Sequence, residues 1–276
     1  AAWGRDAASG YAAVEGDRLL GFLFGDAQED VLRGRSLWVR LAGHALAEGQ
    51  SPELMRDLYQ RAGAEWLERQ GCFNHYVLTF ALGEYLEPWE NLVFAREHAY
   101  ALQALDVGNE AIHELPEGAA IRRATADDAG AFRNFSTIIS GTQSQSPSWV
   151  PAVPEQVEGM REGYAGVPAD EDAIAWIATL NDEPVGFIAY FEPEPDGFEL
   201  SVPHNAIELK IAGTLSQAQG MGIGTALMEH SLRALDWHIP NLLSSRYWPK
   251  RGFEPVVYRM KRVIDSRISS MQIQAP

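Results

Sequence analysis

The sequence has 276 residues, 46% of them hydrophobic, and a net charge of −16 from 22 basic and 38 acidic residues. This length and apolar fraction predict a globular protein large enough for two domains of ordinary size. The excess of acidic residues argues against non-specific binding to nucleic acid or to an anionic membrane.

Targeting and redox signals are missing from the sequence as given. No apolar run approaches the ~20 residues that a membrane span requires, and the first residues show no secretory signal pattern, so we expect a cytoplasmic protein. The single cysteine, Cys72, excludes an internal disulfide and is expected to be a packing residue. The histidines show no metal-binding spacing, so we expect no metal site.

The first hundred residues alternate predicted strands and helices. Ser51 is expected to cap a helix whose first turn holds Pro52. The remaining elements are predicted as strands over 11–24 (two strands around a turn), 36–46, 73–81 and 98–105, with a second helix over 83–94.

Gly, Asn and Pro interrupt this periodicity between residues 107 and 119, which predicts a linker. Beyond it we expect strands over 120–124, 173–179, 185–191 and 207–214, a helix capped near Thr125, another over 155–164, and a turn-rich stretch over 141–154 that contains Trp149. The predicted division is a domain over 1–108, a linker over 109–119, a domain over 120–266 and a tail over 267–276.

Two segments in different halves are alike. Residues 37–46, LWVRLAGHAL, match residues 207–216, IELKIAGTLS, in type at almost every position. A repeat of this kind indicates two copies of one fold.

The most informative stretch follows the second copy of this repeat. There an apolar strand pattern leads into alternating glycines, Gly220, Gly222 and Gly224, and then into helical spacing of apolar residues. Glycines at alternate positions allow a ligand close to the main chain, and the helix start carries partial positive charge, so such a turn suits phosphate. Thr225 excludes a Walker loop and stands where a dinucleotide fingerprint has its third glycine.

The pattern Gln219-x-x-Gly222-x-Gly224 resembles the acyl-CoA loop of the GNAT superfamily of N-acetyltransferases. Residues 183–190 look like the third strand of that family, and residues 241–253 look like its last motif, an Asn followed by an aromatic pair and Lys-x-Gly-Phe. The resemblance covers roughly residues 120–263. It implies an α/β (α+β) fold with two GNAT-like domains, each a mixed, mostly antiparallel sheet with helices on both faces. The first copy, without alternating glycines, looks like a degenerate domain that lacks the cofactor loop.

The resemblance also implies which residues bind acetyl-CoA, the expected co-substrate. The diphosphate would lie on residues 219–225, and the pantetheine arm would lie near the end of the strand and the last motif. The implied cofactor-binding residues are Thr214, Leu215, Ser216, Gln219, Gly220, Met221, Gly222, Ile223, Gly224, Thr225, Asn241, Ser244 and Trp248. A basic stretch over 246–267, with seven basic and two acidic residues, offers a further candidate for phosphate contacts, although a solvated strand end explains it equally well.

Two positions are candidates for acid–base chemistry. Glu208 stands where several members of the family carry a catalytic base, but it is equally well explained as an exposed strand residue paired with Lys210. Many members place a tyrosine acid seven residues after the motif Asn, and here that position holds Trp248, which leaves the adjacent Tyr247, another residue or water as the acid.

The resulting hypothesis is an N-acetyltransferase acting on a primary amine, either a small molecule or a peptide. The alternative is a non-catalytic acyl-CoA sensor, which the tryptophan at position 248 keeps open. The sequence names neither the acceptor nor an oligomeric state, and the short span from Gly224 to Asn241 leaves little room for a helix, a return and a strand.

Overall fold

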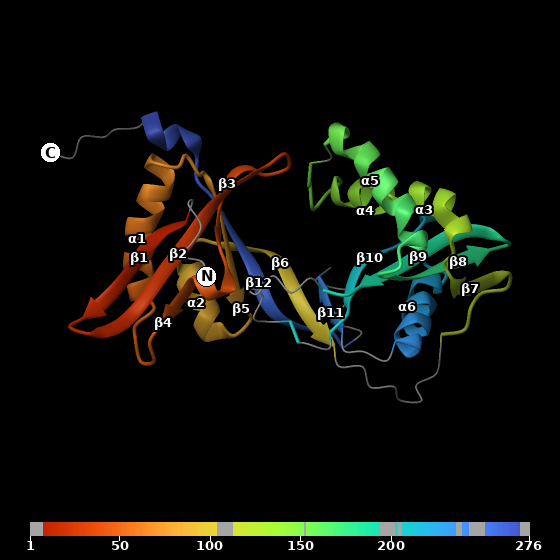
Figure 1. Ribbon diagram of the computed structural model, residues 1–276, viewed down its shortest axis with the longest axis horizontal. Coiled ribbons are helices and arrows are strands. Elements are labelled where there is room, and N and C mark those ends of the chain that lie inside the picture. Colours follow the sequence, from red (N-terminus) through yellow and green to blue (C-terminus); the bar gives the residue numbers. More distant parts are fainter. Residues whose placement is uncertain are drawn as a thin grey trace. The chain divides into compact units, whose positions relative to one another are not determined.

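The computed structural model describes residues 8–103, 113–151, 153–193, 202–203, 206–235, 239–242 and 252–270. The chain forms two compact units (Figure 1). Unit 1 comprises residues 1–101, 195–202 and 243–276, and unit 2 comprises residues 102–194 and 203–242. None of the described helices has the length and apolar character needed to cross a membrane.

Unit 1 is a mixed sheet with its helices on one face. Its strands lie in the order β1-β2-β3-β5-β12-β6, and β4 also pairs with β2. The strands are β1 (Ala8–Glu15), β2 (Arg18–Asp30), β3 (Gly34–Val39), β4 (His44–Leu46), β5 (Asn74–Phe80), β6 (Ala95–Gln103) and β12 (Glu254–Val263), and the helices are α1 (Glu53–Glu68) and α2 (Gly83–Asn91). Strands β3 and β5 run parallel, whereas β1–β2, β2–β3 and β5–β12 are antiparallel.

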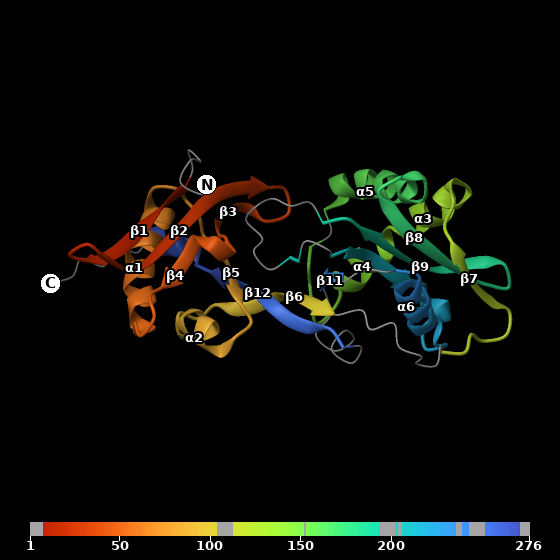
Figure 2. The same cartoon turned by 60° about the horizontal axis from the view of Figure 1, so that its bottom comes forward.

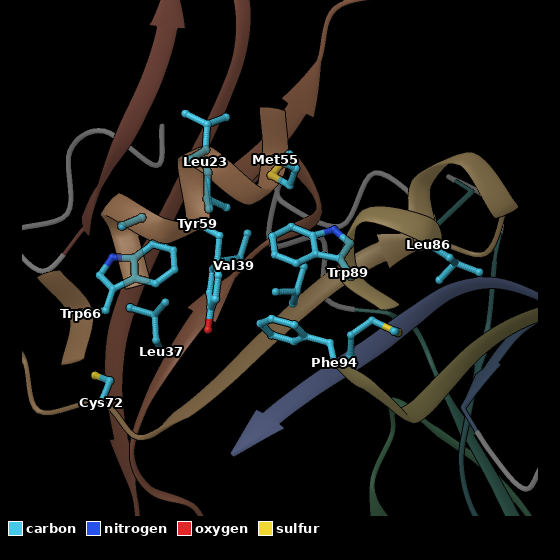
Figure 3. Close-up of a cluster of buried hydrophobic side chains, with 14 residues drawn as sticks. Leu23, Leu37, Val39, Met55, Tyr59, Trp66, Cys72, Leu86, Trp89 and Phe94 are labelled. Carbon is cyan, nitrogen blue, oxygen red and sulfur yellow. The ribbon is translucent and has the colours of Figure 1, made fainter. Parts of the chain in front are cut away.

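The core of unit 1 is rich in aromatic side chains from both helices. Figure 3 shows Tyr59 and Trp66 of α1 and Trp89 of α2 gathered with Phe94 around strand residues such as Val39. The Tyr59 ring meets those of Trp66, Trp89 and Phe94 edge-on, with centroids 5.4–6.3 Å apart. Cys72 is fully buried in the same cluster, which confirms the expected packing role.

Unit 2 is a sheet with helices on both faces. Its strands lie in the order β11-β10-β9-β8-β7, all antiparallel except the pair β10–β11. The strands are β7 (Ala119–Arg123), β8 (Ala173–Leu180), β9 (Glu183–Phe191), β10 (Glu208–Thr214) and β11 (Ile239–Leu242), and the helices are α3 (Ala129–Phe135), α4 (Thr137–Gln143), α5 (Pro154–Gly166) and α6 (Ile223–Ala234). Helix α6 covers one face, and α3 to α5 cover the other (Figures 1 and 2).

Each face of this sheet has its own contacts. On the α3–α5 face, the Phe187 ring of β9 stacks on Phe135 of α3, with centroids 5.0 Å apart. On the α6 face, the Tyr190 hydroxyl of β9 lies 2.8 Å from the Ser231 hydroxyl of α6. Helix α6 spans 12 residues and β11 begins at Ile239, so a return of four residues accommodates the short span noted in the sequence.

The predicted fold class is confirmed, and the repeat has a structural counterpart. In unit 1 the antiparallel pair β2–β3 leads through α1 to β5, which is parallel to β3. In unit 2 the pair β9–β10 leads through α6 to β11, which is parallel to β10. Of the two similar sequence segments, residues 207–216 cover β10, whereas residues 37–46 cover the end of β3, the 3-10 turn Leu41–Gly43 and β4, and both β3 and β4 pair with β2.

Three expectations differ from the structure. Both described helices of unit 1 lie on one face, because a tight turn joins β1 to β2 where unit 2 inserts α3 to α5 between β7 and β8. Helix α4 extends to Gln143, so its last three residues lie in the stretch over 141–154 that was expected to be rich in turns. Strand β12, placed by the sequence in the second domain, pairs with β5 of unit 1 from Val257 to Val263, so the boundaries of the two units differ from the predicted division.

Candidate cofactor site

The candidate site lies where β10 passes into α6. Thr214 ends β10, Ser216–Ala218 forms a 3-10 turn, and Gly222 immediately precedes the first residue of α6. Gly220 and Gly222 both adopt positive φ, 80° and 82°, which L side chains rarely do. Glycine adopts this backbone conformation without strain, so these two positions allow the chain to turn sharply into the helix.

Hydrogen bonds and packing fix the shape of this turn. The Gln219 side-chain amide donates to the Thr214 carbonyl at 3.1 Å, which ties the two ends of the loop together. A Cβ on Gly224 would lie 3.1 Å from Thr214 Oγ1, so this glycine permits a close approach of helix and strand. Ile223 is fully buried and anchors the helix start, whereas Gly220 and Met221 are exposed.

The loop can therefore present main chain to an anion. The space beside Gly220 is open, with no atom within 4 Å of the position of a Cβ. A helix start carries a partial positive charge of about half an elementary charge, which favours phosphate. Thr214, Leu215, Ser216 and residues 219–225, which the family resemblance assigns to the cofactor, lie where β10 passes into α6.

The equivalent place in unit 1 is chemically different. Helix α1 begins at Glu53, one residue later than expected, and the Ser51 hydroxyl accepts the Glu53 N–H at 3.3 Å. The Glu53 carboxylate in the first turn also pairs with Arg56. A carboxylate here already complements the helix dipole, so this helix start does not favour a diphosphate.

Glu208 lies on the face of the sheet opposite α6. It pairs with Phe191 of β9, which packs against the aromatic cluster under α3 and α5, and paired residues share a face. A bulge follows, so that Leu209 pairs with Tyr190 and Ile211 with Ala189. Among the described residues, Lys210 forms no ion pair with Glu208, and its ammonium lies 5.3 Å from the centre of the Phe191 ring.

The last motif is described only in part. Asn241 lies in β11, opposite Leu209 of β10, so its backbone is next to the strand that carries Glu208. Ser244, Tyr247 and Trp248 lie outside the described residues. The candidate general acid, Tyr247, therefore stays a prediction from the sequence.

The basic stretch near the C-terminus contributes to unit 1. Arg259 and Lys261 of β12 both pair with Glu97 of β6, and Arg262 donates to the Leu92 carbonyl. Arg267 pairs with Asp265. These four cations have partners within unit 1, which favours the alternative of a strand end over phosphate contacts for them, while Arg246, Lys250 and Arg251 lie outside the described residues.

One neighbour of the loop was not expected from the sequence. His113, assigned there to the linker, lies against Gly222, and its backbone N–H donates to a Glu229 carboxylate oxygen of α6 at 2.6 Å. No motif connects His113 to the glycine turn, so only the fold reveals this contact. Among the described residues, no cluster of histidine, cysteine and carboxylate side chains could hold a metal ion.

Comparisons with known proteins agree with this geometry. Residues 141–244 match the model of the acetyltransferase (GNAT) family. The chain superposes on a GCN5-related N-acetyltransferase from Sphaerobacter thermophilus with a TM-score of 0.57 and 15% identity, covering 90% of this chain and 80% of that one. It superposes on another from Kribbella flavida with a TM-score of 0.51 and 14% identity, covering 95% and 92%.

A tandem GNAT protein from the clavulanic acid biosynthesis pathway has a similar fold, with a TM-score of 0.51, 13% identity and coverage of 94% and 84%. No curated protein matches this chain. The matched region contains the glycine turn and β10, and it lies wholly in the C-terminal half. Residues 141–244 therefore match the model of the acetyltransferase (GNAT) family, and the chain shares its fold with these three solved structures.

Proposed function

We propose that this protein transfers the acetyl group of acetyl-CoA to a primary amine. The observation that carries the proposal is the glycine turn at the start of α6, which lies within the region that matches the family model. Acetyl-CoA would supply an activated thioester. The chain would supply the cradle for its diphosphate at residues 219–225 and the strand end at Thr214, Leu215 and Ser216.

The position of Glu208 supports a role for it as the base. An amine must lose a proton to act as a nucleophile, and a carboxylate is a suitable acceptor. Glu208 is half-buried at the start of the strand that leads to the cofactor turn, on the side of α3 to α5. An acceptor amine bound on that side would lie across the sheet from α6, within unit 2.

Unit 1 has the counterpart of the strand and helix but lacks the glycine turn. The acidic first turn of α1 and the absence of a helical insertion between β1 and β2 both argue for one working site per chain. We propose that unit 1, a degenerate copy, contributes to stability.

A thiol-release assay with acetyl-CoA and a panel of amines tests the proposal. At least one amine should stimulate release, and Glu208→Gln should lower turnover while the affinity for acetyl-CoA is kept. Lys210→Gln, on the adjacent exposed position, is the matched control and should leave turnover nearly unchanged. Tight binding of acetyl-CoA without thiol release for any amine would favour the non-catalytic acyl-CoA sensor.

A further inference from the structure

The imidazole of His113 lies beside the start of α6. The position that a Cβ of Gly222 would take is 2.8 Å from both Cδ2 and Nε2 of His113. Real Cβ atoms do not approach other atoms this closely, so a side chain at position 222 would displace the ring. Two features therefore favour glycine at position 222: its positive φ of 82°, and the ring of His113, which leaves no room for a Cβ.

The backbone of His113 is held on α6 by a separate contact. Its N–H donates to Glu229 Oε2 at 2.6 Å. Glu229 follows Gly222 by about two helical turns, so both lie on the same side of α6. This bond uses the main chain of His113 and leaves its exposed imidazole directed toward the helix start.

The cofactor turn has no long basic side chain of its own. The sequence from Leu215 to Leu232 contains no lysine or arginine. Two other basic groups of unit 2 contact aromatic rings: Lys210 lies over Phe191, and Arg123 lies over the Trp176 ring at 4.5 Å. The helix dipole alone offers only about half a charge to a diphosphate. A donor brought from another segment would therefore add substantially to binding.

We propose that His113 is a further cofactor-binding residue, whose Nε2–H donates a hydrogen bond to the diphosphate of the acyl-CoA on the glycine turn. This inference rests on the proposed function, because it assigns a second segment to the same site. Residues 219–225 supply main-chain groups, and the segment before β7 supplies the side-chain donor. In the structure, Gly222 faces the imidazole of His113 and not open space.

Calorimetry with acetyl-CoA tests this role. His113→Ala keeps the backbone N–H that bonds Glu229 and removes only the imidazole, so the dissociation constant should rise about tenfold or more, as expected for a hydrogen bond to a charged group. His230→Ala on α6 is the matched histidine control and should leave the constant unchanged. An unchanged or lower dissociation constant for His113→Ala would overturn the assignment.

Two further probes locate the contact. Coenzyme A and dephospho-coenzyme A share the diphosphate and differ in the 3′-phosphate, so His113→Ala should weaken both by the same factor. A loss seen only with coenzyme A would overturn the diphosphate assignment. If the wild-type protein binds none of these compounds, the proposed function fails together with this inference, whereas binding that His113→Ala does not affect removes only the inference.

A test without ligand examines the contact itself. Gly220 and Gly222 have nearly equal φ values, but a Cβ at Gly220 would meet no atom within 4 Å. Gly222→Ala should therefore lower the melting temperature more than Gly220→Ala, and the excess should disappear when His113 is also alanine. An excess that persists in the His113→Ala background would show that the ring does not lie against Gly222.

Discussion

Met260 of β12 lies opposite Val77 of β5, although all of unit 2 lies between them in the sequence. Both side chains are almost completely buried in the core beneath α1, with exposed fractions of 0% and 1%. Strand β12 follows the whole of unit 2 along the chain, yet it fills the sheet of unit 1 between β5 and β6. The core of unit 1 is therefore complete only when the last strand has joined it.

Truncation of Met260 should destabilise unit 1. Met260→Ala leaves a cavity among closely packed side chains and should lower the free energy of unfolding by about 2–5 kcal/mol. Val263→Ala, on the same strand at a side chain that is 66% exposed, is the control and should cost well under half of that amount. Urea unfolding followed by tryptophan fluorescence measures both, and equal costs would contradict the placement of β12.

Stability should fall as the solution is made acidic, because two histidines are buried in their neutral form. Burial lowers the pKa of His44 to about 4 and that of His75 to about 4, against an ordinary value of 6.5. Their contribution is present above pH 6.5 and is lost as the unfolded chain takes up protons below it. By pH 5 we expect a loss of about 2 kcal/mol for each histidine.

His44→Gln separates this effect from the titration of carboxylates. The Nε2 atom of His44 lies 2.9 Å from the Leu78 carbonyl, so it donates there, and a glutamine amide can replace this donor without titrating. Between pH 6.5 and 5 the urea midpoint of the variant should fall less steeply than that of the wild type. Parallel curves would show that His44 is not a buried neutral group.

The attachment of α6 to the sheet should depend on one buried hydroxyl pair. The Tyr190 and Ser231 hydroxyls lie 2.8 Å apart and either can donate, while Ser231 Oγ also donates to the Met228 carbonyl at 2.9 Å and the Tyr190 hydroxyl to the Met228 sulfur at 3.8 Å. Ser231→Ala removes the buried partner of the Tyr190 hydroxyl and should cost about 1–3 kcal/mol of unfolding free energy. The double variant with Tyr190→Phe should cost less than the sum of the two single changes, and simple additivity would contradict the pairing.

Much of the fold follows from local sequence patterns. The similarity of residues 37–46 and 207–216 indicated two copies, and β3 and β10 do occupy equivalent places before a helix and a parallel strand. The alternating glycines indicated a strand-to-helix turn with exposed main chain, and in the structure Gly220 and Gly222 form that turn with positive φ. Both features are set by residues that are close together in the sequence, so a local sequence pattern predicts them.

The features that could not be predicted depend on contacts between residues that are far apart in the sequence. Val257 and Met260 of β12 lie on opposite faces of the sheet and in different buried clusters. Backbone hydrogen bonds suit any sheet edge, so the partner of β12 is decided by the side chains that it packs against. Helix α4 has a β-branched, glycine-containing sequence, and it is packed through Ile138 against Gly213 of β10. The contact of His113 with Gly222 has no sequence signature, because it joins two segments with no shared pattern.

The central claim, that acetyl-CoA binds through its diphosphate at the glycine turn, is tested most directly by calorimetry on a matched pair at Gly220. The open space and the φ of 80° at this position accept asparagine and aspartate equally well, so Gly220→Asn and Gly220→Asp differ only in charge. The wild type should bind one acetyl-CoA per chain, and the aspartate should weaken binding at least about tenfold relative to the asparagine, because its charge repels the phosphates. Absence of binding to the wild type, a second site per chain, or equal affinities of the two variants would contradict the account.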